Sequence, residues 1–116
     1  MTCFWDALRS RLNLNQSNKE FITYLKHSNK EYVIVLWNGE SLSKKQMEEN
    51  YEHVRDFNEN SINNGYDCSI CDPFLIMVCE LYNVNINHNY NGYNMKYTKD
   101  NNERTLDFSS DTGHFR

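Results

Sequence analysis

The spacing of hydrophobic residues predicts four helices in the first two thirds of the chain. Over residues 3–12, hydrophobic residues recur every four positions, at Phe4, Leu8 and Leu12. Thr2 stands where it could cap this helix. Two capping boxes, Ser17 with Glu20 and Ser43 with Gln46, mark the starts of a second and a third helix. Asp72-Pro73 supplies a cap and an N1 proline for a fourth helix, which is apolar nearly all round and should be central and buried.

The period changes to two from Val84 onward, which predicts strands. Asn91-Gly92 is a strong hairpin signal between two alternating segments, and residues 105–108 give a third strand after a turn at 100–102. Residues 32–37 favour a buried strand by propensity, closed by a turn at Asn38-Gly39, although so short an apolar run is also compatible with a buried helix. The expected architecture is α+β, with helices followed by a small antiparallel sheet in one domain over residues 1–116.

Composition and charge exclude several classes of protein. Acidic residues outnumber basic ones, 16 to 12, and the net charge of −4 argues against a general nucleic-acid binder. No apolar run approaches the roughly 18 residues of a membrane span, and Asp6 and Arg9 interrupt the N-terminal stretch before a signal peptide could form. We therefore expect a cytoplasmic monomer with its four cysteines reduced.

Two residues at opposite ends of the chain have the chemistry of a nucleophile and its base. Cys3 stands at the first turn of the first predicted helix, where exposed N–H groups and the helix dipole stabilise a thiolate. His114 follows the last predicted strand, where a loop can present an imidazole, and Gly113 before it permits a close backbone approach. A cysteine at a helix start paired with a histidine on a sheet is the layout of papain-like cysteine proteases.

A second constellation suggests metal binding instead. Cys68 and Cys71 form a Cys-x2-Cys pair, followed by Cys79 and His88, and thiolate with imidazole is the usual ligand set of zinc. Cys79 falls inside the apolar fourth helix, where a cysteine is more often a small core residue. The zinc interpretation and the packing interpretation both remain open at this point.

Three segments, in order along the chain, resemble one family. Thr2-Cys3-Phe4-Trp5-Asp6-Ala7-Leu8 is similar to the start of the catalytic helix in ovarian-tumour (OTU) type deubiquitinases. Asn64-Gly65-Tyr66-Asp67 with the following helix and strand resembles that family's middle segment, and Gly113-His114-Phe115 resembles its ending. The chain is short, as viral members often are.

The resemblance implies a papain-like, OTU-like fold and a catalytic pair made of Cys3 as the nucleophile and His114 as the general base. Many members carry an orienting Asp or Asn two residues after the histidine; here Arg116 stands there and cannot accept a hydrogen bond. Asp111 or Asp107 could serve instead, and the sequence does not select between them.

The implied reaction is hydrolysis of amide or isopeptide bonds at the C-terminus of ubiquitin or a ubiquitin-like protein, or within a viral polyprotein. The implied partners include neither nucleic acid nor membrane, and the mechanism requires no cofactor and no metal. Both chain ends fall at the expected site, so we expect either a piece cut from a larger protein or a site that only binds. The alternative function is a catalytically inactive OTU-like module that docks a host protein through exposed aromatic side chains and the acidic face of the third helix.

Overall fold

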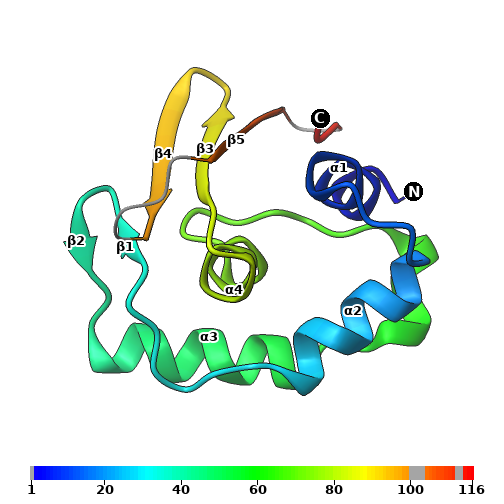
Figure 1. Cartoon of the computed structure of the whole chain (residues 1–116), viewed down its shortest axis with the longest axis horizontal. Coiled ribbons are helices and arrows are strands. Elements are labelled where there is room, and N and C mark those ends of the chain that lie inside the picture. The colour runs from blue at the N-terminus through cyan, green and yellow to red at the C-terminus, as the bar shows by residue number, and fades with distance from the viewer. Residues whose placement is uncertain (1, 100–103, 112–113) are drawn as a thin grey trace.

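The computed structural model describes residues 2–99, 104–111 and 114–116. Over these ranges the chain forms four α-helices, one 3-10 helix and five strands (Figure 1). In chain order they are α1 (Cys3–Leu12), α2 (Asn18–His27), β1 (Leu36–Trp37), β2 (Glu40–Ser41), α3 (Lys44–Asp56), η1 (Glu59–Asn64), α4 (Pro73–Tyr82), β3 (Asn85–Tyr90), β4 (Tyr93–Thr98) and β5 (Thr105–Ser110). The predicted α+β class is confirmed. The turn expected at 100–102 and Gly113 lie outside the described residues.

The helices begin where local hydrogen bonding predicts. Both capping boxes are complete: the Ser17 and Ser43 hydroxyls each accept from the backbone N–H three residues on, and each N3 side chain accepts from the cap N–H. Thr2 is the exception, because its hydroxyl donates to the Asp6 carboxylate and makes no cap hydrogen bond to α1.

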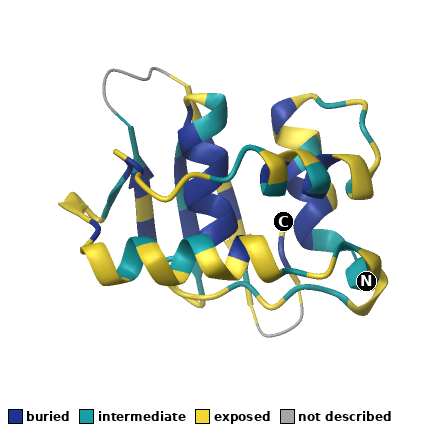
Figure 2. Ribbon diagram, turned by 90° about the horizontal axis from the view of Figure 1, so that it is seen from below, coloured by how far each residue is buried: buried dark blue, intermediate teal, exposed yellow. Residues whose placement is uncertain are grey.

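Helix α4 forms the centre of the molecule, as its apolar sequence predicts. It lies between the sheet and the pair α2 and α3 (Figure 1), and it contacts α2, α3, β3 and β4. Residues 73–80 are all buried, and Figure 2 shows α4 dark blue through most of its length. Its capping Asp72 is completely buried as well.

The sheet has the order β2-β1-β4-β3-β5 and is mixed. The hairpin of β3 and β4 turns at Asn91-Gly92, where both residues have positive φ, as a type I′ turn requires. Strand β5 runs parallel to β3, so the prediction of a purely antiparallel sheet is wrong. The reason is that β1 already pairs with the far edge of β4, through Leu36 opposite Thr98, so β5 occupies the free edge of β3.

The segment 32–37 is only partly a strand. Val33 and Val35 are buried while Tyr32 and Ile34 are exposed, so the side chains alternate, but ladder pairing is confined to β1. Asn38 and Gly39 form the predicted turn, which leads into the two-residue strand β2. None of the helices in the described ranges combines the length and apolarity that crossing a membrane requires.

Candidate active site

One cleft, of about 400 Å³, collects residues from both ends of the chain. It is lined by the start of α1, the end of η1 with the loop after it, the ends of β3 and β5, and the segment after β5. The lining residues are Cys3, residues 64–68, Tyr90, Ser110, Asp111, His114 and Phe115. Cys3 is half-buried at the first position of α1, and His114 is exposed. The two residues selected from the sequence as nucleophile and base therefore line the same cleft.

Aromatic packing next to each of these residues draws the two chain ends together. The ring of Phe4, which follows Cys3, lies 4.8 Å between centroids from the ring of Phe115, which follows His114. Phe115 is held in turn against the sheet by the Phe108 ring at 5.1 Å. Ser109 and Arg116 exchange two backbone hydrogen bonds of 2.8 Å, which fold the C-terminal segment back onto β5 beside α1 (Figure 1).

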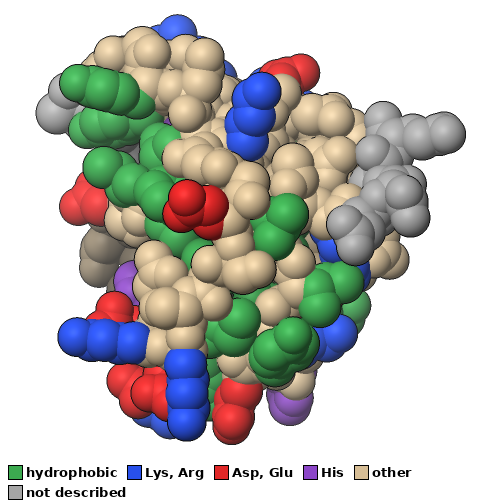
Figure 3. All heavy atoms as spheres, turned by 90° about the vertical axis from the view of Figure 1, so that its left-hand side faces the viewer, with side chains coloured by type: hydrophobic (Ala, Val, Ile, Leu, Met, Phe, Trp, Pro, Cys, Tyr) green, Lys and Arg blue, Asp and Glu red, His purple; other side chains and the backbone are tan. Residues whose placement is uncertain are grey.

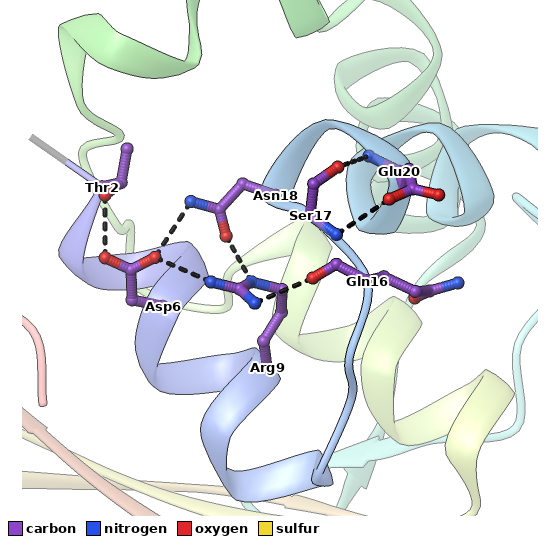
Figure 4. A network of polar contacts seen from close by, with 7 residues as sticks. All are labelled: Thr2, Asp6, Arg9, Gln16, Ser17, Asn18 and Glu20. Carbon is purple, nitrogen blue, oxygen red and sulfur yellow. Dashed lines mark hydrogen bonds and ion pairs between the residues drawn. The ribbon is translucent and has the colours of Figure 1, made fainter.

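A polar network fixes the first turns of α1 against the start of α2 (Figure 4). The Asp6 carboxylate accepts from the Thr2 hydroxyl at 2.8 Å, from the Asn18 amide at 2.9 Å and from the Arg9 guanidinium at 3.1 Å. Although partial burial of the Asp6 carboxyl raises its pKa, these hydrogen bonds outweigh that effect and hold the pKa below its ordinary value. The network orients Thr2, the residue that immediately precedes Cys3.

The two candidates for the orienting acid lie in different places. Asp111 lines the cleft, and its carboxylate accepts from the His114 backbone N–H at 3.1 Å, so it shapes the turn that carries the histidine. Asp107 does not line the cleft: it alternates with the buried Leu106 and Phe108 along β5 and accepts from the Asn87 amide at 3.1 Å. The structure thus places Asp111, and not Asp107, beside His114.

The remaining cysteines are not arranged as a metal site. Among the described residues, which include Cys68, Cys71, Cys79 and His88, there is no group of three or more His, Cys, Asp or Glu side chains that could hold a metal ion. Cys79 is fully buried in α4, where its thiol donates toward the Tyr97 carbonyl, as the packing interpretation predicts. The structure therefore does not bring Cys68, Cys71, Cys79 and His88 together as one four-ligand zinc site.

Burial keeps these three thiols protonated. Burial, with a further contribution from the Asp72 charge, raises the pKa of Cys71 to about 11 and that of Cys68 further, and burial likewise raises the pKa of Cys79. A thiolate is the reactive form of cysteine, so the structure disfavours all three as nucleophiles.

Residues 64–68 form one wall of the cleft, and Asp72 holds this segment in place through hydrogen bonds. The sequence did not predict this role of Asp72. One carboxylate oxygen caps α4 by accepting from the Phe74 N–H at 2.9 Å, and the other accepts from the Tyr66 hydroxyl at 2.8 Å and the Ser69 N–H at 3.0 Å. The Asp72-Pro73 pair predicted the cap of α4. The sequence does not predict that the second carboxylate oxygen of Asp72 binds Tyr66 and Ser69, because the loop that carries them folds back onto Asp72 only in the tertiary structure.

Comparisons with protein-family models, with curated proteins and with solved structures found no match to this chain.

Proposed function

We propose that this protein is a cysteine protease of the papain-like, OTU-like type, which hydrolyses amide or isopeptide bonds at the C-terminus of ubiquitin or a ubiquitin-like protein. The observation that carries the proposal is that Cys3, at the start of α1, and His114, beside β5, line the same cleft. An amide bond at a viral polyprotein junction would be cleaved by the same chemistry. The proposal places the activity in the host-cell cytoplasm.

In the proposed reaction, the His114 imidazole accepts the proton of the Cys3 thiol, and the thiolate attacks the carbonyl carbon of the scissile bond. The imidazolium then gives its proton to the leaving amine, and water hydrolyses the thioester to release the carboxylate and the free thiol. The position of Cys3 supports this role, since the N-terminus of a helix stabilises negative charge and Thr2 does not cap α1 with its side chain. Asp111 supports His114 through the backbone hydrogen bond described above.

The test is reaction with ubiquitin that carries an electrophile at its C-terminus. We expect the parent protein to form a covalent adduct on Cys3 and the Cys3→Ala variant to form none, both detected as a mass shift. Cys71→Ala is the matched control, because it removes a half-buried thiol outside the cleft and should leave adduct formation unchanged. Equal labelling of the parent and of Cys3→Ala would refute the proposed nucleophile.

A second candidate is a catalytically inactive module of the same fold that docks a host protein. It is favoured by large apolar side chains at the surface, which Figure 3 shows on the side of the molecule that carries β1 and β2. Tyr93 is 75% exposed, Tyr32 71% and Ile70 67%. A folded protein that binds unmodified ubiquitin in titration calorimetry, yet forms no adduct with the electrophile, would support this candidate over the protease.

A further inference from the structure

A buried histidine lies directly behind the cleft and contacts three of the residues that line it. His88, on β3, is 1% exposed. Its Nε2 lies 2.6 Å from the Ser110 hydroxyl oxygen, and its ring packs 5.2 Å from the Phe115 ring and 6.4 Å from the Tyr90 ring. Its other nitrogen, Nδ1, is buried and has no hydrogen-bond partner among the described residues. The sequence suggested His88 only as a possible zinc ligand, and the structure places it instead against Ser110.

These surroundings select one protonation state of His88. Burial lowers the pKa of the imidazole below its ordinary value, so near neutral pH the neutral ring, which carries a single proton, is the favoured form. Buried N–H groups without a partner are rarer than buried acceptors without one. The proton therefore resides on Nε2, which donates it to the Ser110 oxygen, and the unpartnered Nδ1 retains only a lone pair.

This assignment determines where the Ser110 proton can go. The oxygen accepts from His88, so the hydroxyl must donate its own proton elsewhere, and Ser110 lines the cleft. The cleft carboxylates of Asp67 and Asp111 can only accept hydrogen bonds when ionised, and the Tyr66 hydroxyl donates to Asp72. Ser110 thus offers the cleft a hydroxyl hydrogen-bond donor, which the side chains of Asp67, Asp111 and Tyr66 do not.

On the basis of the proposed protease function, we propose that Ser110 is a substrate-binding residue, whose hydroxyl, held by His88, donates a hydrogen bond to a carbonyl oxygen of the substrate's acyl segment. An extended peptide end offers its backbone carbonyl oxygens as acceptors, and a donor oriented before binding loses little freedom when the substrate arrives. His88 is a positioning residue, because it acts through Ser110 and does not reach the cleft in the polar contacts described.

The experiment measures kcat/KM for hydrolysis of a fluorogenic amide at the C-terminus of ubiquitin. We expect Ser110→Ala to lower kcat/KM about 10-fold, as loss of one hydrogen bond to the substrate does, and Ser110→Thr to stay within about 3-fold of the parent. His88→Phe should lose as much as Ser110→Ala, whereas His88→Gln should recover much of the activity because its amide can supply the N–H. The double variant His88→Phe/Ser110→Ala removes both the His88 N–H and its Ser110 acceptor, so no buried donor is left without a partner. Its kcat/KM should be no lower than that of either single variant.

Three results would contradict these proposals, and each leads to a different conclusion. An active parent with an equally active, folded Ser110→Ala variant overturns this inference and leaves the protease function intact. A proton on Nδ1 instead of Nε2, read from the ¹⁵N chemical shifts of the His88 ring, also overturns it without reference to activity. A parent that neither hydrolyses the amide nor labels at Cys3 overturns the proposed function, and this inference with it.

Discussion

Replacing Asp72 by Asn separates the two roles that its carboxylate oxygens perform. Oδ1 accepts from the N–H groups of Phe74 and Leu75 and so caps α4, while Oδ2 accepts from the Tyr66 hydroxyl and from Ser69. An asparagine keeps one acceptor oxygen and puts an NH₂ group in place of the other. Whichever way the amide is oriented, one set of donors then faces a second donor.

The magnitude follows from burial. Asp72 is 0% exposed, so water cannot replace the lost acceptor. A buried donor left without a partner costs about 1–3 kcal/mol of unfolding free energy, and we expect Asp72→Asn to lose that amount. Asp72→Ala removes the cap as well, which adds about 1 kcal/mol and brings the expected loss to about 2–4 kcal/mol.

Urea unfolding followed by tryptophan fluorescence measures both losses, because Trp5 packs 5.3 Å from the Tyr66 ring and 4.9 Å from the Phe74 ring. The midpoints should fall in the order parent, Asn, Ala, with the slope m unchanged. Asp67→Asn is the control: this exposed carboxylate lies in the same loop, and its substitution should change stability by less than about 0.5 kcal/mol. If Asp72→Asn matched the parent, or Asp72→Ala were no worse than Asp72→Asn, the assignment of separate roles to the two oxygens would be refuted.

Three further predictions concern the thiols, the buried histidine and a helix start. With iodoacetamide near neutral pH, Cys3 should label faster than Cys71, whose pKa is raised to about 11; peptide mapping that found Cys71 labelled first would contradict this. Because the folded-state pKa of His88 lies below its unfolded value, the folded protein binds fewer protons, so stability is fully present above about pH 6.5 and is lost as pH falls from there toward the folded pKa. His88→Gln should remove that part of the acid-side loss in urea melts between pH 7 and pH 5, and an unchanged pH profile would count against a neutral buried ring. Ser17→Ala should lose about 1 kcal/mol, since its hydroxyl accepts from the Glu20 N–H in a complete capping box, and an unaltered midpoint would show that α2 does not depend on this box.

The features that the sequence predicted well are those set by residues close together in the chain. Helix starts at Ser17, Ser43 and Asp72 follow from side-chain oxygens within reach of backbone N–H groups two or three residues on. The hairpin at Asn91-Gly92 follows from the ease with which both residues adopt positive φ. The pairing of β5 was predicted wrongly, because strand alternation specifies which face is buried but not which neighbour is free.

The candidate site shows the same division. Cys3 and His114 could be selected from the sequence because a helix start and a loop after a strand are local features with known chemical consequences. Asp107 and Asp111 could not be distinguished there, because the choice depends on which face of β5 Asp107 occupies and on how the residues after β5 fold back around Asp111.

By itself, then, the sequence determined the four α-helices, the hairpin and the residue types suited to nucleophile and base, since these depend on interactions within a few positions. Only the tertiary structure decided that Cys3 and His114, which are 111 positions apart in the chain, would line one cleft. The packing of Phe4 on Phe115 joins these two regions. The tertiary structure also placed His88 against Ser110, and the second carboxylate oxygen of Asp72 within hydrogen-bonding distance of the Tyr66 hydroxyl. Such contacts join residues from different elements, and they form only when burial of the shared core brings those elements together.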